Sequence, residues 1–143
     1  MSVSADTLAG RLTAHGHELL QRVYYEDTDF SGRVYHARYL QFLERGRSDY
    51  LRLLGIGHTE MFEQGFAFVV RHMEIDFQRV AGIDDVLCVE TTTESVGGAS
   101  MVLKQTISRN GETIVSALIK VALIDRNGRP QRLPRDMRER LGR

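Results

Sequence analysis

The sequence predicts an α+β domain in which one long helix lies on an antiparallel sheet of about five strands. Three observations lead to this fold class. Residues 37–54 show helical periodicity over about five turns. One β-pattern precedes this segment and four follow it. The dipeptide Asn110-Gly111 is a type I′ turn signal, so the last two strands should pair as a hairpin.

The N-terminal stretch, residues 1–16, is small, polar and without periodicity, which predicts a flexible arm. From residue 17 the chain becomes apolar and β-favouring, and the polar segment EDTDFSG ends this first strand. No repeat, linker or low-complexity segment divides the remainder. We therefore expect a single domain over residues 17–143.

The predicted helix has one wide apolar stripe. Its apolar positions are Leu40, Leu43, Gly46, Tyr50 and Leu54, widened by Phe42, Leu51 and Leu53. Arginines and other polar residues fill most of the opposite face, and Gly55 and Gly57 follow as a stop signal. A helix this apolar needs a large surface to lie on.

Four downstream strands provide that surface. They are predicted at residues 66–77, 86–96, 101–108 and 113–124. Gly97-Gly98 is interpreted as a turn or bulge, because a phosphate-binding loop would precede a helix and here a strand follows. The arginine-rich C-terminal segment is expected to be a solvated end. This order along the chain, one strand, then a long helix, then four antiparallel strands, indicates a hotdog fold.

Composition excludes several classes of function. Lys and Arg number 19, as do Asp and Glu, so the formal charge is zero, which argues against a nucleic-acid partner. No apolar run approaches the roughly 18 residues of a transmembrane segment, and no signal-peptide pattern is present, so we expect a cytoplasmic protein. The histidines lack ligand-like spacing, so no metal site is predicted. The single cysteine, Cys88, is expected to be a small core residue.

The segment between the first strand and the helix carries the candidate chemistry. A helix N-terminus presents free backbone N–H groups that can polarise a carbonyl. Asp29, on the loop before it, could serve as a nucleophile or as a general base for water. Gly32 would allow a bulky substrate group to approach the backbone. From these residues alone, an acid that caps the helix or a turn explains Asp29 equally well.

The stretch YYEDTDFSGRVYHARYLQFLERGRSDYLRLLGI resembles the start of the 4-hydroxybenzoyl-CoA thioesterase family, most closely its Tol-Pal-associated, YbgC-type branch. The shared pattern is D-T-D, then G-x-V-Y-H-x-x-Y, then F-x-E-x-x-R. The resemblance implies that Asp29 is the catalytic carboxylate and that the backbone N–H of His36 polarises the thioester carbonyl. It also implies that Tyr35 and Tyr39 line the acyl site. Arg33 departs from the aliphatic residue expected at that position.

Other features of the resemblance concern substrates and partners. It implies an acyl-CoA substrate, with acyl carrier protein as another potential carrier, no cofactor, and a homo-oligomer (dimer or tetramer) whose sites lie at subunit interfaces. Arg79 is a candidate for binding CoA phosphates, although a solvated strand-edge charge explains it as well. Whether the His36 ring also acts as a general acid is left open by the sequence. The alternatives are a non-catalytic acyl-CoA-binding or scaffold protein of the Tol-Pal machinery and, less favoured, a hydratase.

Overall fold

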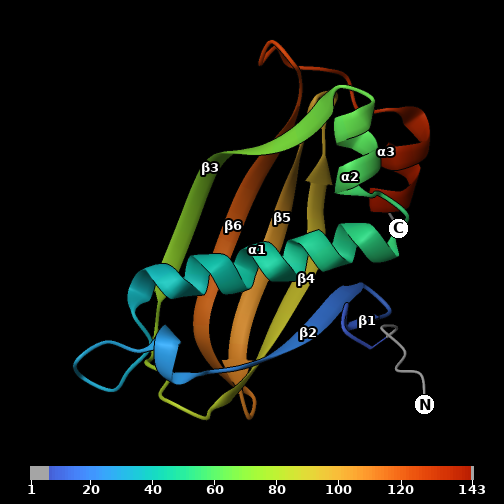
Figure 1. Ribbon diagram of the computed structural model, residues 1–143. Coiled ribbons are helices and arrows are strands. Elements are labelled where there is room, and N and C mark those ends of the chain that lie inside the picture. The colour runs from blue at the N-terminus through green and yellow to red at the C-terminus, as the bar shows by residue number, and fades with distance from the viewer. Residues whose placement is uncertain (1–6, 143) are drawn as a thin grey trace, which may run out of the picture.

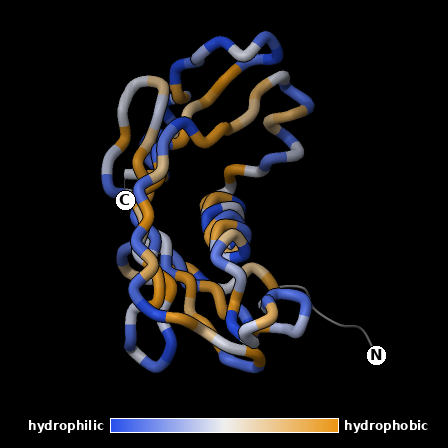
Figure 2. Tube along the Cα trace, turned by 90° about the vertical axis from the view of Figure 1, so that its left-hand side faces the viewer, coloured by the Kyte–Doolittle hydropathy of each residue, from blue (hydrophilic) through white to orange (hydrophobic). Residues whose placement is uncertain are grey.

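The computed structural model describes residues 7–142 and contains one six-stranded antiparallel sheet crossed by one long helix (Figure 1). Figure 2 looks nearly along this helix and shows the chain curving around it. In chain order the elements are β1 (Arg11–Leu12), β2 (Gly16–Arg22), η1 (Tyr25–Asp27), α1 (His36–Leu53), α2 (His58–Glu63), β3 (Phe66–Phe77), β4 (Val86–Val96), β5 (Ser100–Arg109), β6 (Glu112–Asp125) and α3 (Arg135–Leu141).

The strand order across the sheet is β1-β2-β4-β5-β6-β3. β4, β5 and β6 form a meander, whereas β3 crosses over to pair with β6 and forms one edge. Asn110 and Gly111 have φ angles of 50° and 82°, the positive values that a type I′ turn requires. The predicted hairpin between the last two strands is therefore confirmed.

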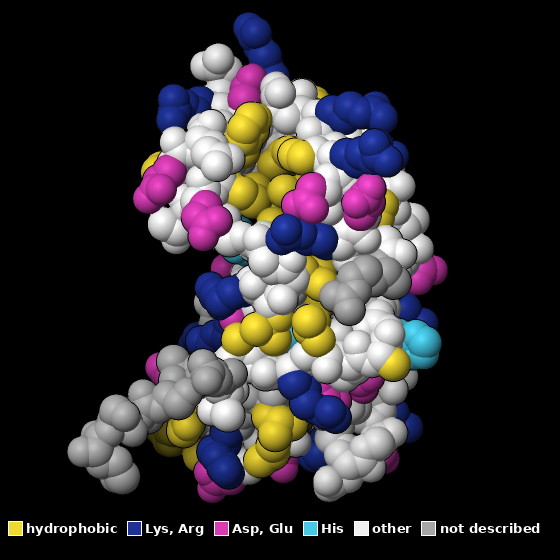
Figure 3. Space-filling view, turned by 90° about the vertical axis from the view of Figure 1, so that its right-hand side faces the viewer, with side chains coloured by type: hydrophobic (Ala, Val, Ile, Leu, Met, Phe, Trp, Pro, Cys, Tyr) yellow, Lys and Arg dark blue, Asp and Glu magenta, His cyan; other side chains and the backbone are white. Residues whose placement is uncertain are grey.

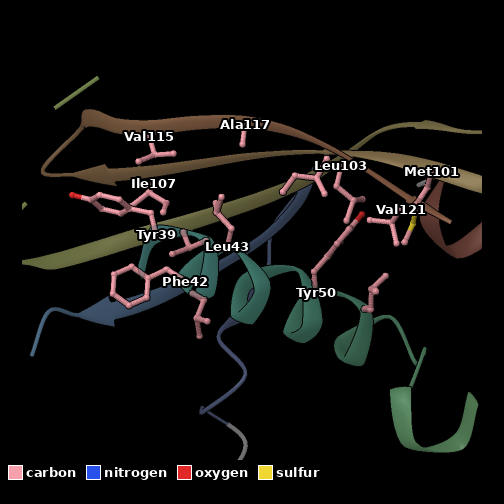
Figure 4. Packing of buried hydrophobic residues seen from close by; sticks show 14 of the residues in the cluster. Tyr39, Phe42, Leu43, Tyr50, Met101, Leu103, Ile107, Val115, Ala117 and Val121 are labelled. Carbon is pink, nitrogen blue, oxygen red and sulfur yellow. The ribbon is translucent and has the colours of Figure 1, made fainter. Parts of the chain in front are cut away.

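The core lies between α1 and the inner face of the sheet (Figure 4). The helix packs mainly on β2 and β4. Phe42 and Leu43 on its buried stripe are fully buried, as are Leu87 and Leu103 on the strands beneath. Burial of each such side chain stabilises the fold by about 1.5–3 kcal/mol. This packing fixes α1 across the sheet, so its N-terminal end is held at one side of the molecule.

Polar side chains also enter this core, among them Gln105 and Thr91. Gln105 on β5 is fully buried, and its Nε2 donates hydrogen bonds to the Leu43 carbonyl of α1 at 2.8 Å and to Thr91 Oγ1 of β4 at 2.9 Å. Gly46 lies beside this contact, and a Cβ built there would stand 2.6 Å from Val89 Cγ1. The absence of a side chain at position 46 therefore lets the helix approach the sheet closely.

The predicted flexible arm over residues 1–16 does not extend as far as residue 16. Residues 1–6 of that arm lie outside the described residues. Arg11 and Leu12 form β1 and pair with β2, and His17 Nε2 lies 2.6 Å from the Ala9 carbonyl oxygen. The assignment of residues 11–16 to an arm is therefore wrong. A two-residue strand is too short to produce periodicity, and its pairing depends on β2.

The prediction of a solvated C-terminal end is also wrong. Residues 135–141 form α3, and Leu133 and Leu141 are buried in the core. The backbone N–H of Leu133 donates to the Gly98 carbonyl at 2.7 Å, which ties this segment to the β4–β5 turn. Basic and acidic side chains are interspersed on the face that carries α3 (Figure 3). The tail therefore completes the fold.

Candidate active site

Asp29 lies on a tight turn between η1 and α1. Thr28 and Val34 form an isolated antiparallel bridge that brings the two ends of this turn together. Between them, the Asp29 backbone N–H donates to the Arg33 carbonyl at 2.9 Å. We call residues 28–34 the Asp29 hairpin. Its geometry presents the Asp29 side chain to solvent.

Gly32 closes this turn, because its N–H donates to the Asp29 carbonyl at 3.0 Å. Its φ angle is 76°, which glycine adopts without the steric cost that a Cβ imposes. A Cβ built at this position would meet no described atom within 4 Å. The turn conformation, and not a close approach by another part of the chain, therefore accounts for glycine here.

The Asp29 carboxylate is oriented by Ser31. Oδ1 accepts two hydrogen bonds, from the Ser31 N–H at 2.8 Å and from the Ser31 hydroxyl at 2.6 Å. These hydrogen bonds, the hydroxyl first, lower the pKa of Asp29 below its ordinary value. Within the described part of the chain, Oδ2 accepts no hydrogen bond. The carboxylate is thus ionised at neutral pH, with one oxygen fixed and the other free.

The N-terminus of α1 follows the hairpin directly. Its N-cap residue, Tyr35, provides no side-chain cap, and its own N–H donates to the Asp27 carbonyl at 3.0 Å. The N–H of His36, the first helical residue, has no acceptor among residues 7–142. Such an N–H, at the positive end of the helix dipole, can bind a developing negative charge.

Asp27 is a structural acid. Its carboxylate is buried, accepts the Tyr24 N–H at 2.8 Å, and lies 3.3 Å from Arg38 Nε on α1. Arg38 also donates to the Glu26 carbonyl. These contacts join η1 to the first turn of α1, so the two acids of D-T-D have different surroundings: Asp27 is buried and paired, whereas Asp29 is exposed.

A surface depression adjoins Asp29. Its lining residues are Tyr25, Thr28, Asp29, Phe30, Gly32 and Ile83. Tyr25 and Phe30 are almost fully exposed aromatic side chains. The ionised Asp29 carboxylate therefore lies beside an apolar surface that is exposed to solvent. Sequence reasoning identified Asp29 and Gly32 but missed the others. Tyr25, Thr28 and Phe30 flank the D-T-D motif and could have been inferred from it, whereas Ile83 is brought there by a distant loop.

The predicted aromatic residues do not line this depression. The Tyr35 ring lies 4.7 Å from the His36 ring, which packs edge-on against Phe77 at 6.1 Å. Tyr39 is 3% exposed, and its hydroxyl accepts the Ala81 N–H at 3.1 Å. Burial raises the pKa of Tyr39. In the single chain, Tyr39 is therefore a core residue that holds the loop before β4.

Arg79 is also engaged elsewhere. Its guanidinium donates to the Thr113 carbonyl at 2.8 Å and lies 3.5 Å from a Glu112 carboxylate oxygen. The structure does not bring Arg79 to the depression. Arg33, the unexpected residue of the motif, is exposed and helps to lower the pKa of Asp29.

Neither metal chemistry nor thiol chemistry has support among residues 7–142. No group of three or more His, Cys, Asp or Glu side chains in this range could hold a metal ion. Cys88 is half-buried in β4, and burial raises the pKa of its thiol, which disfavours the thiolate. No helix in the described range has the length and apolar character needed to cross a membrane.

Comparison with known proteins identifies the family. The model of the family described as "Thioesterase superfamily" matches residues 31–116, more than half of the chain. The chain belongs to the thioesterase superfamily. The matched region of this thioesterase begins two residues after Asp29, so it contains His36 but not Asp29 itself.

Individual relatives agree with this family. Acyl-CoA thioesterase YbgC of Haemophilus influenzae is 46% identical to this thioesterase over 112 residues, which cover 78% of this chain and 82% of that protein. Long-chain acyl-CoA thioesterase FadM of Escherichia coli is 31% identical over 120 residues, covering 79% and 87%. A crystal structure of a probable thioesterase from Bartonella henselae matches with a TM-score of 0.80 and 46% identity, covering 83% and 99%. The predicted hotdog fold and YbgC-type branch are confirmed.

Proposed function

We propose that this thioesterase hydrolyses acyl-CoA thioesters to the free acid and CoA, with Asp29 as its catalytic carboxylate. The proposal rests on one observation above the others: Ser31 fixes Oδ1 of an ionised Asp29 and leaves Oδ2 free, on the turn that enters the uncapped end of α1. The similarity to the Haemophilus influenzae acyl-CoA thioesterase supports the substrate class.

Asp29 can act in two ways. As a nucleophile, Oδ2 would attack the thioester carbon and form a mixed anhydride, which water then hydrolyses. As a general base, it would accept a proton from the water that attacks the same carbon. In both routes the carbon–sulfur bond breaks and the thiolate takes up a proton. The His36 N–H would stabilise the oxyanion that forms on the carbonyl.

The state of assembly is part of the proposal. β3 is an edge strand of 12 residues. Val70 and Phe77 on its inner face are about half exposed, and exposed apolar edges are sites of strand pairing. We propose a homo-oligomer in which a second copy covers this edge, as a dimer or as part of a tetramer.

Finer properties are also part of the proposal. An acyl carrier protein as an additional carrier and an association with the Tol-Pal machinery are drawn from the family resemblance, whereas a cytoplasmic location is the expectation from the sequence patterns. The relatives include a protein named a long-chain acyl-CoA thioesterase and one named without a chain length, so the acyl preference is left open. A thiol-release screen over short, long and aromatic acyl-CoAs measures that preference directly.

The catalytic assignment is tested by Asp29→Asn, which keeps the shape of the side chain and removes its charge. We expect turnover of the best acyl-CoA to fall roughly 100-fold or more, the contribution of a positioned nucleophile or base. Glu26→Gln is the matched control, because Glu26 is an exposed acid in the same segment and should keep wild-type turnover.

Thiol release is measured for both variants, and circular dichroism checks that each is folded. Wild-type turnover in Asp29→Asn would refute the role of Asp29. Binding of acyl-CoA by the wild-type protein without turnover across the whole substrate panel would support the alternative, a non-catalytic binding or scaffold protein.

A further inference from the structure

Arg109, at the end of β5, makes contacts that the proposed chemistry does not use. Its Nη1 donates to Asp85 Oδ2 at 2.8 Å and to the Val80 carbonyl at 3.2 Å. Its Nη2 lies 3.8 Å from a Glu112 carboxylate oxygen. A guanidinium can hold several acceptors in one fixed geometry, so Arg109 joins the β5–β6 hairpin to the loop between β3 and β4.

Asp85 completes this contact from the other side. Its Oδ2 accepts the backbone N–H of Gly82 at 2.8 Å as well as the Arg109 bond. The Gly82 N–H and then the Arg109 guanidinium lower the pKa of Asp85, so the pair is ionised at neutral pH. We call Arg109 and Asp85 the clamp, because together they hold both ends of residues 80–85.

The clamped loop supports the Asp29 hairpin. The Val34 N–H donates to the Ala81 carbonyl at 2.8 Å, and Arg33 forms an antiparallel bridge with Gly82. Ile83 of the same loop lines the depression beside Asp29. One side of the Asp29 hairpin therefore lies on the loop that the clamp fixes.

The same loop is tied to α1. The Ala81 N–H donates to the buried Tyr39 hydroxyl, one turn after the start of the helix. The position of this loop thus contributes, beside the Asp27–Arg38 contact, to how the Asp29 hairpin lies relative to the first turn of α1. A shift of about 1 Å between reacting groups can cost up to 100-fold in rate.

We propose that Arg109 and Asp85 are positioning residues that hold the Asp29 hairpin in its catalytic orientation through the loop at residues 80–85. Neither residue lines the depression, so neither is expected to contact substrate. The effect on rate rests on the proposed function, whereas the effect on the hairpin does not. The two parts can therefore fail separately.

The test uses Arg109→Met, Arg109→Lys and Asp85→Asn in the full chain. We expect Arg109→Met and Asp85→Asn to lower kcat about 10-fold to 100-fold while KM changes little, since the substrate surface is intact. Arg109→Lys should restore part of kcat, because lysine keeps the charge for Asp85 but lacks the fork that also reaches Val80. The double variant of Asp85→Asn and Arg109→Met should lose no more than either single variant.

Hydrogen exchange gives a second measurement that needs no turnover. The amides of Val34 and Gly82 should exchange faster in Arg109→Met and Asp85→Asn, while the amides of β5 and β6 keep their wild-type protection. Arg135→Met is the matched control, because Arg135 forms an exposed ion pair with Glu139 on α3 and should change neither kcat nor exchange.

The outcomes separate the two proposals. Unchanged exchange at Val34 and Gly82, together with unchanged kcat, would overturn the clamp even if Asp29→Asn abolishes turnover. A uniform rise in exchange across the sheet would also overturn it, because the pair would then support only global stability. Faster local exchange in a protein without thioesterase activity would support the clamp and contradict the proposed function.

Discussion

At the scale of single residues, Ser31 determines how the Asp29 carboxylate is oriented. Its N–H and its hydroxyl both bind Oδ1, and Oδ2 is left for the proposed reaction. The pKa of Asp29 is lowered chiefly by the hydroxyl. A lower pKa makes Asp29 a weaker base. It also keeps the carboxylate ionised down to a lower pH.

Ser31→Ala tests this dependence on pH. The Ser31 hydroxyl is the main cause of the lowered pKa of Asp29, and a lowered pKa keeps the carboxylate ionised at lower pH. Removing the hydroxyl should therefore raise the pKa of Asp29. The acidic limb of the kcat/KM profile should therefore move to higher pH. The measurement is the pH–rate profile of both proteins, with Ser95→Ala, an exposed serine on β4, as the control. An acidic limb that stays in place or moves lower would contradict the role of Ser31.

The sequence predicts the part of the site that is continuous in the chain. Asp29 and Gly32 lie within one short motif, and the structure places both beside the depression. Ile83 joins them only because the loop before β4 folds under the hairpin. Tyr39 belongs to the same motif, yet its position on the buried stripe of α1 turns it into the core. Residues that meet through tertiary contacts carry no local signal.

At the scale of elements, the fit of α1 on the sheet depends on Gly46. Alanine at this position would gain about 1 kcal/mol in helix propensity. Its Cβ would, however, stand 2.6 Å from the fully buried, β-branched Val89. Overpacking of this kind costs about 1–3 kcal/mol. We therefore expect Gly46→Ala to lower the free energy of unfolding, as measured by urea denaturation.

Ser48→Ala on the same helix is the control for Gly46→Ala. Ser48 is half-buried and makes no hydrogen bond through its hydroxyl within the described chain, so its removal should change the free energy of unfolding by less than about 0.5 kcal/mol. If Gly46→Ala were as stable as the wild-type protein, the close approach of α1 to the sheet would not require glycine at this position.

The longer elements were predictable because their patterns repeat many times. The predicted helix at residues 37–54 differs from α1 by one residue at each end, and β3 and β4 have their predicted bounds. The short elements β1, α2 and α3 were missed. α2 and α3 have six and seven residues, too few turns for an apolar period to emerge, and each is held by buried contacts such as Met61 and Leu141.

At the scale of the whole molecule, the edge strand β3 makes the assembly testable. Val70 on its inner face is 43% exposed, as is Val86 on β4, a strand inside the sheet, where Val86 pairs with Arg22 of β2. Val70→Lys should weaken the proposed homo-oligomer, because a charge on an edge strand opposes pairing. Val86→Lys, with equal exposure, should not. Analytical ultracentrifugation measures the mass of each variant in solution. If Val70→Lys and Val86→Lys had the same mass, an interface at β3 would be contradicted.

The hydrogen bond from Gln105 to the Leu43 carbonyl has a consequence for motion along the axis of α1. If only apolar side chains were in contact, a helix could move along its axis over a sheet at a modest cost in free energy. Any such sliding would take the Leu43 carbonyl away from the buried Gln105 amide, which would keep only its hydrogen bond to Thr91, and a buried donor group left unpaired costs about 1–3 kcal/mol. The Gln105 side chain, in the middle of the sheet, thus helps to fix the axial position of α1, and with it how far the first turn of the helix extends toward Asp29.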